Sequence, residues 1–174
     1  MRIRPSPQPA PAGRGRKSWL LLAGWVAIIL LLTLLPEAGP VREDNLAPLR
    51  SVQRLLHAVH RSGLFGHAAR IWAFNIAGNL LLFLPVGWLA YWSLRVRRRS
   101  RWLAASGAGL LSLTLSVAIE IYHFNIPQRT ADVDDVIFNL VGAASGIGLG
   151  WWRERGMECS SSVTSRETAT RNRS

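Results

Sequence analysis

A stretch in the second half of this chain gathers residues that can do chemistry. It holds four of the ten acidic residues, together with an imidazole, a guanidinium and an amide: Glu120, His123, Arg129, Asp132, Asp134, Asp135 and Asn139. Such groups transfer protons, hold cations or bind anionic ligand groups. Residues 102–119 and 136–152 on either side carry no charge, which predicts two transmembrane helices joined by an acidic turn. Ionisable groups at a membrane boundary are costly and often functional; the plainer interpretation is that they mark where two helices leave the bilayer.

Helical periodicity predicts how these groups are positioned. At about 3.6 residues per turn, one face of the later helix carries Asp132, Asp135, Asn139, Gly142, Gly146 and Gly150. The earlier helix has a matching stripe, formed by Gly109, Ser112, Ser116, Glu120 and His123. Small residues four apart let a neighbouring helix approach closely, and we expect that neighbour to be the earlier helix, the third span. This pairing would bring Glu120 toward Asp135 and Asn139.

Apolar residues are concentrated in four blocks, at positions 19–35, 71–92, 102–119 and 136–152. Blocks of this length predict an all-α, polytopic membrane protein with four transmembrane helices. The expected organisation is a disordered basic N-terminal tail over residues 1–17, a four-helix membrane domain over 18–152 and a disordered cytoplasmic tail over 153–174. The first block follows basic residues as a signal peptide would, but it is longer than the usual apolar core of about 7–15 residues. Its length favours a retained helix.

The first connection contains a second helical pattern, over residues 49–61. Its apolar positions share one face, whereas Arg50, Gln53, Arg54, His57 and Arg61 lie opposite. This pattern predicts an amphipathic surface helix in the first external loop, with Asp44 or Asn45 capping its start. We interpret His57, His60 and His67 as solvated, because they lack the spacing of a metal site.

Positive charge sets the expected orientation. The chain has 21 Lys and Arg against 10 Asp and Glu, a formal net charge of +11. The arginines lie at span edges and in tails, which favours topology and anionic lipids as the explanation over nucleic acid. Fifteen basic residues fall in the two tails and the 95–101 connection, against six on the opposite side. We therefore expect a multi-pass plasma-membrane protein with both termini cytoplasmic. The single Cys159 excludes an intramolecular disulfide and a cysteine-built zinc site.

The second span adds a polar group at a matching depth. Asn75 and Asn79 share a face with Gly78, and asparagines must point into the bundle because lipid cannot satisfy them. We expect a polar pocket that opens outward. Its candidate ligand-binding residues are Asn79, Glu120, Arg129, Asp132, Asp135 and Asn139.

Three motifs carry a resemblance to a known family. The pattern of Glu120, Arg129, Asp132, Asp135, Asn139, Gly142 and Gly146 resembles the C-terminal signature of the VanZ-like family of small bacterial membrane proteins. The second span matches that family at Asn79, Phe83, Pro85 and Gly87, and Asn45-Leu46-Ala47-Pro48 resembles its motif after the first helix. The resemblance covers roughly residues 19–152 and implies a link to teicoplanin resistance, as in the family's namesake.

The acidic stretch has a charge surplus. Glu120, Asp132, Asp134 and Asp135 against Arg129 leave three negative charges in excess. Protonation, a bound cation or arginines from the first loop could each resolve it. We favour pairing with arginines; we assign no metal and no cofactor, because oxygen-only metal sites are poorly specified by sequence.

Three functions remain as hypotheses. The first is a module that binds an envelope lipid or lipid-linked cell-wall precursor, or that alters glycopeptide access, with membrane lipids as partners and no nucleic acid. The second is a membrane enzyme acting on a lipid-linked substrate, with Glu120, His123 or Asp135 as catalytic candidates. The absence of a nucleophile triad, a zinc motif or a phosphate-binding glycine loop weakens it. Proton or ion transport ranks last, because the inner halves of the spans lack a continuing ionisable path.

Overall fold

The structure, a computed structural model, describes residues 12–34, 45–97, 100–126 and 131–171, with the backbone alone for 12–16 and 157–171. It contains five helices, α1 Ala12–Leu34, α2 Arg50–Ser62, α3 His67–Arg95, α4 Arg101–Phe124 and α5 Val133–Arg171. Four segments are long and apolar enough to cross a membrane: Lys17–Leu34, His67–Arg95, Arg101–Phe124 and Val133–Gly156. The predicted all-α, four-span architecture is therefore confirmed.

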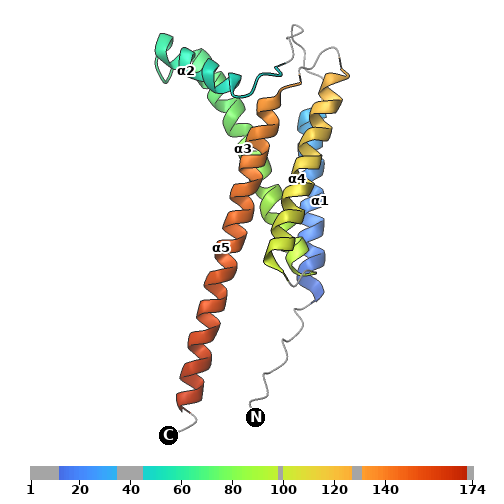
Figure 1. Ribbon diagram of the computed structural model, residues 1–174, viewed down its shortest axis with the longest axis vertical. Coiled ribbons are helices and arrows are strands. Elements are labelled where there is room, and N and C mark those ends of the chain that lie inside the picture. Colours follow the sequence, from blue (N-terminus) through green and yellow to red (C-terminus); the bar gives the residue numbers. More distant parts are fainter. Residues whose placement is uncertain (1–11, 35–44, 98–99, 127–130, 172–174) are drawn as a thin grey trace.

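The four long helices run side by side, and α2 lies across one end of the bundle (Figure 1). We call this the α2 end; it also holds the start of α5 and the last turn of α4. The opposite, α3–α4 end holds the connection between those two helices and the start of the described part of α1. The predicted helix in the first connection is confirmed as α2. Its apolar Leu56 stays exposed, as an interfacial helix requires.

Small residues hold α3 and α5 together, the most extensive helix pair of the bundle. A Cβ atom added at Gly142 would come within 2.2 Å of the Leu80 carbonyl oxygen, and one at Gly146 within 2.0 Å of the Leu84 oxygen. From the other side, a Cβ atom at Gly87 would lie 2.0 Å from the Ala143 oxygen. The two backbones therefore touch where neither helix carries a side chain.

This packing corrects our predicted helix pairing. The glycines of α5 face the second span, α3, and not the third span, α4. The reason is that α3 offers Gly87 at the crossing, whereas Gly109 of α4 has no atom within 4 Å of an added Cβ. α4 does contact α5, and there the fully buried Ser116 of its stripe accepts a hydrogen bond from the Asn139 amide, as expected for that stripe.

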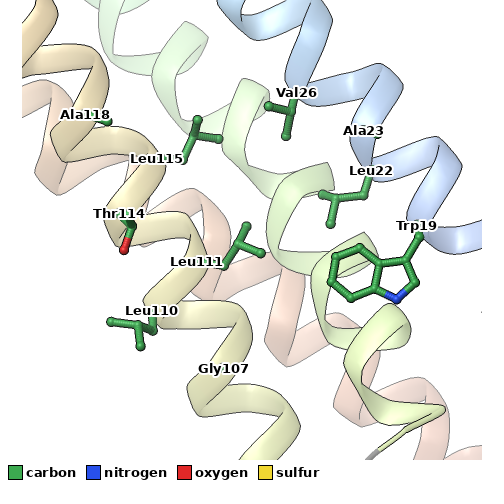
Figure 2. A pocket seen from close by; sticks show the side chains of 10 residues that line it. All are labelled: Trp19, Leu22, Ala23, Val26, Gly107, Leu110, Leu111, Thr114, Leu115 and Ala118. Atoms are coloured by element: carbon green, nitrogen blue, oxygen red, sulfur yellow. The ribbon is translucent and has the colours of Figure 1, made fainter.

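The first helix packs mainly on α3, where the Trp25 indole donates to the Leu82 carbonyl at 2.8 Å. Its contact with α4 is thin. An open apolar groove of about 670 Å³ separates the two, with Leu22 and Val26 of α1 facing Leu111 and Leu115 of α4 (Figure 2). Its apolar lining suits contact with acyl chains.

Helix extends into both segments for which the sequence predicts disorder. The backbone of α1 begins at Ala12, directly after the last proline of the N-terminal segment, and α5 continues to Arg171. Proline is the residue that stops a helix most strongly, and the sequence has none after Pro127. The polar composition of the C-terminal tail favours disorder, but the tail contains no proline that would end a helix between Gly156 and Arg171.

Candidate binding site

The start of α5 is fixed by two carboxylates. Asp132 caps the helix, because its Oδ1 accepts a hydrogen bond of 2.8 Å from the Asp134 backbone N–H. The backbone N–H of Asp132 in turn donates to Glu120 Oε2 at 2.8 Å. Glu120, in the last turns of α4, thereby ties α4 to the first residue before α5.

Asn45 joins the first loop to the same place. Its backbone N–H donates to the Ala131 carbonyl at 2.9 Å, and its carbonyl accepts from the Val133 N–H at 3.0 Å, forming an isolated parallel bridge. The Asn45 side-chain amide also donates to Asp132 Oδ1 at 2.7 Å. Asn45 is 3% exposed, so the loop is bonded to α5 in an enclosed position.

Asp134 caps a helix other than its own. Its buried carboxylate accepts from the backbone N–H groups of Leu49 and, at 2.6 Å, of Ser51. Both donors belong to the start of α2, where Leu49 is in the left-handed region with φ of 62°. Helix N-termini attract negative charge, so Asp134 holds α2 against α5. Of the two predicted caps, Asn45 bonds α5 instead, and Asp44 lies outside the described residues.

Asn79 and Asp135 pair across α3 and α5. The Asn79 amide donates to Asp135 Oδ1 at 2.5 Å. One turn further along α5, the Asn139 amide donates to Ser116 Oγ of α4 at 2.9 Å. Asn79 and Asn139 therefore point into the bundle, as the cost of an unsatisfied amide in lipid requires. Asn75, for which the sequence predicts the same, is instead exposed.

The predicted single cluster is thus a series of linked pairs around the start of α5. The structure brings Glu120 to Asp132 and Asn79 to Asp135, and it places Asn139 one turn below with Ser116. Arg129 lies outside the described residues. Sequence reasoning did not assign Asp134 or Asn45 to the site. The two residues lie inside two of the three family motifs, one in each, which is the only indication that the sequence gives of them. Their roles depend on contacts between segments that are distant in the chain.

His123 connects α4 to α1. Its Nε2 lies 3.0 Å from the Thr33 carbonyl oxygen, which can only accept, so Nε2 donates. Its Nδ1 is 3.6 Å from Glu120 Oε1, an ion pair when the ring is protonated. The residue is 7% exposed. Both ring nitrogens face protein atoms, an arrangement that suits a structural tie better than a base presented to a substrate.

Negative charge accumulates at this end of the molecule. Burial raises the pKa of Asp132, as do the nearby charges of Asp134 and Glu120, while hydrogen bonds from the Asp134 N–H and the Asn45 amide oppose the shift. Among the described residues, no group of three or more His, Cys, Asp or Glu side chains is arranged to hold a metal ion. Among the described residues, neutral hydrogen-bond donors supply most of the compensation for this negative charge.

A second polar group lies at the α3–α4 end and was not predicted. Glu154 of α5, 7% exposed, accepts from Arg95 Nε at 2.7 Å and from the Tyr91 hydroxyl, and lies 3.8 Å from Arg101 Nε. The prediction placed Glu154 in a disordered tail. The sequence does contain an indication of this position, because the four-residue spacing of Gly146 and Gly150 continues to residue 154 on the same helix face.

Comparison with known proteins agrees with these features. A family model described as VanZ/LLP1 matches residues 18–154, from the start of the first span through the ion-paired glutamate of α5. No curated protein and no solved structure gives a match. The matched range covers most of the chain, all four spans and every motif that forms the pairs around the start of α5. The chain therefore belongs to the VanZ/LLP1 family of membrane proteins.

Proposed function

We propose that this protein binds an envelope lipid or a lipid-linked cell-wall precursor at the α2 end of its bundle. In this proposal the α2 end faces outward from the plasma membrane and both termini lie in the cytoplasm. The excess of basic residues in the tails and the α3–α4 connection supports that orientation.

The surplus of acceptors around the start of α5 carries the proposal. Glu120, Asp132 and Asp135 accept bonds from neutral backbone or amide groups, and no Lys or Arg among the described residues forms an ion pair with them. The Oδ1 atoms of Asn45 and Asn139 are buried and have no hydrogen-bond partner in the described part of the chain. A ligand that supplies hydroxyl, amide or ammonium donors would satisfy this site. Envelope headgroups and cell-wall precursors carry such donors.

Changed susceptibility to glycopeptides such as teicoplanin is the proposed consequence for the cell. These antibiotics act on cell-wall precursors outside the membrane, so a protein that binds such a precursor there would alter access. The support for this step is the family alone.

The two other hypotheses receive less support. The enzyme hypothesis takes Glu120, His123 or Asp135 as catalytic candidates, and both ring nitrogens of His123 face protein atoms. Transport would need a relay between the acidic α2 end and Glu154. Between them, Gly142 and Gly146 of α5 pack directly against the α3 backbone, where no ionisable group can stand.

Lipid analysis of the purified protein tests the proposal. The full chain is extracted in mild detergent, and its bound lipids are compared with the bulk extract of the same membrane. We expect one lipid class to be enriched at least about tenfold, which corresponds to about 1.4 kcal/mol of selectivity. A bound fraction with the composition of the bulk membrane would contradict specific binding.

A further inference from the structure

A basic pocket lies between α2 and the beginning of α3, apart from the pairs around the start of α5. It has a volume of about 540 Å³ and is lined by Arg54, His57, Ala58, Arg61, Ser62, Ala68 and Trp72. This volume suits a small ligand or headgroup, since such sites span about 300–1,000 Å³. None of its residues belongs to the three family motifs.

Both walls of the pocket are fixed by the fold. At one end of α2, the Asp134 carboxylate holds the first turn. At the other end the chain turns back at Gly63, whose φ of 76° is in the left-handed region, and passes Gly66, where an added Cβ would lie 2.1 Å from Ser62 Oγ. The tight return places α2 beside the first turns of α3. The space between them is therefore a built feature and not a gap beside a loose loop.

The lining chemistry selects an anion. Arg54 and Arg61 are seven residues apart, two helical turns, and hence share one face of α2 with His57 near it. The Arg54 guanidinium lies over the Trp72 ring, 4.9 Å from its centroid. The attraction between the cation and the ring holds the guanidinium in place without using any of its N–H donors. No carboxylate among the described residues pairs with Arg54 or Arg61. Two forked cations on one wall match the oxygens of a phosphate group.

The surroundings indicate a lipid as the source of that phosphate. Leu64 and Phe65 lie in the short return between α2 and α3, just after the pocket residue Ser62 in the chain, and they are 65% and 86% exposed. Trp72 stands near the start of the second span, a position typical of the membrane interface. A headgroup in the pocket would thus have its acyl chains beside exposed apolar side chains. A soluble anion gains nothing from them.

We infer that the pocket formed by Arg54, His57, Arg61 and Trp72 binds the phosphate of a membrane lipid. This assignment rests on the proposed function and specifies where the ligand's phosphate is held, while the carboxylates and asparagines around the start of α5 receive its donor groups. The competing explanation is a diffuse one, in which the arginines of α2 merely attract an anionic surface.

Charge-preserving substitution separates a built site from a diffuse surface. Arg54→Lys keeps the positive charge but removes the planar guanidinium that lies over the Trp72 ring. A built site should therefore lose affinity for the lipid phosphate, whereas a diffuse basic surface should not. Native mass spectrometry of the detergent-solubilised full chain measures binding of added phosphatidylglycerol, polyprenyl phosphate or inorganic phosphate. We expect Arg54→Lys and Arg61→Gln each to weaken binding of the preferred phospholipid at least about tenfold. The control Arg70→Gln removes one charge from nearby α3 outside the pocket, and binding should stay within about twofold.

The outcomes distinguish the two proposals. The pocket assignment is overturned if Arg54→Lys and Arg61→Gln retain the enriched lipid class as fully as the wild-type protein does. In that case the proposed function still stands, but without this pocket. An equal loss with Arg70→Gln would also overturn the pocket, in favour of a diffuse surface. Inorganic phosphate that competes at the same concentration as lipid would overturn the lipid as its source. A wild-type protein that binds none of the lipid probes and carries no enriched lipid overturns both proposals.

Discussion

At the scale of single residues, Asp134 shows most clearly how the α2 end is held together. A fully buried carboxylate is normally unfavourable, and it is retained only where hydrogen bonds compensate for the lost hydration. Here the backbone N–H groups of Leu49 and Ser51 and, at 3.4 Å, the Asn45 amide supply that compensation. One residue on α5 therefore fixes the start of α2 and, through it, the wall of the basic pocket.

We expect Asp134→Asn to loosen α2. An amide offers one acceptor oxygen where the carboxylate offers two, and its NH₂ group would face a backbone N–H. A donor left unsatisfied in a buried position costs about 1–3 kcal/mol. Hydrogen exchange of the amides at positions 49–53 should accelerate by about tenfold or more, while exchange in α4 stays unchanged. The control Gln53→Ala alters an exposed residue of α2 and should leave the same amides protected. Unchanged exchange in Asp134→Asn would show that other contacts hold α2.

At the scale of helices, the sequence predicts what depends on local pattern. The four spans follow from long uncharged blocks, and α2 follows from its amphipathic spacing. The pairing of α5 with α3 does not follow, because glycine periodicity says that a helix is close and not which helix it is. Gly87 of α3 and Gly109 of α4 look equivalent in sequence, and only the crossing geometry separates them.

The same limit applies to the candidate site. Spacing along one helix face identifies Glu120, Asp135 and Asn139 as inward-facing. It cannot identify Asn45 and Asp134, because their partners lie more than eighty residues away in the chain. Glu154 was missed for a different reason. The four-residue spacing of Gly146 and Gly150 reaches position 154, but the polar sequence around it favours a solvated tail over a continued helix.

A pair of glycine substitutions on α5 tests the helix pairing. Gly146→Ala should destabilise the bundle by about 1–3 kcal/mol, because the added methyl group collides with the α3 backbone at the Leu84 carbonyl. The control Gly148→Ala meets no atom within 4 Å, and its gain in helix propensity should leave stability equal or higher by up to about 1 kcal/mol. Unfolding in detergent by a denaturing surfactant measures both. Equal stability of the two variants would show that Gly146 is not at the contact between α3 and α5.

At the scale of the whole molecule, the two ends of the bundle differ in chemistry. The α2 end combines buried carboxylates and amides with a separate basic pocket. The α3–α4 end is closed by the ion pair of Glu154 with Arg95, whose guanidinium lies 2.7 Å from the carboxylate. Between the ends, the interior is apolar and closely packed around Phe83, Val86 and Ala143. This asymmetry suits a protein that meets its ligand at one membrane face.

Labelling of single cysteines tests the orientation. With Cys159 replaced by serine, a cysteine at Leu64 should react with a membrane-impermeant maleimide in intact cells, because that residue is 65% exposed beside α2. A cysteine at Ser100, in the basic α3–α4 connection, should react only after the cells are opened. The opposite labelling pattern would place the α2 end in the cytoplasm and remove the proposed access to envelope precursors.

The central claim is that the polar residues around the start of α5 bind the ligand and do not merely fix the helices. Lipid retention by Glu120→Gln and Asp135→Asn tests it most directly, because both substitutions keep the size of the side chain and one oxygen that can accept the observed bond while removing the charge. The control Ser145→Ala lies on α5, where the hydroxyl bonds only within its own helix at Val141. With stability and expression matched across the variants, we expect both charge-removing substitutions to lose the enriched lipid by about tenfold or more and the control to keep it. Stable variants of Glu120 and Asp135 that retain the lipid as the wild type does would contradict the account and leave these residues a purely structural role.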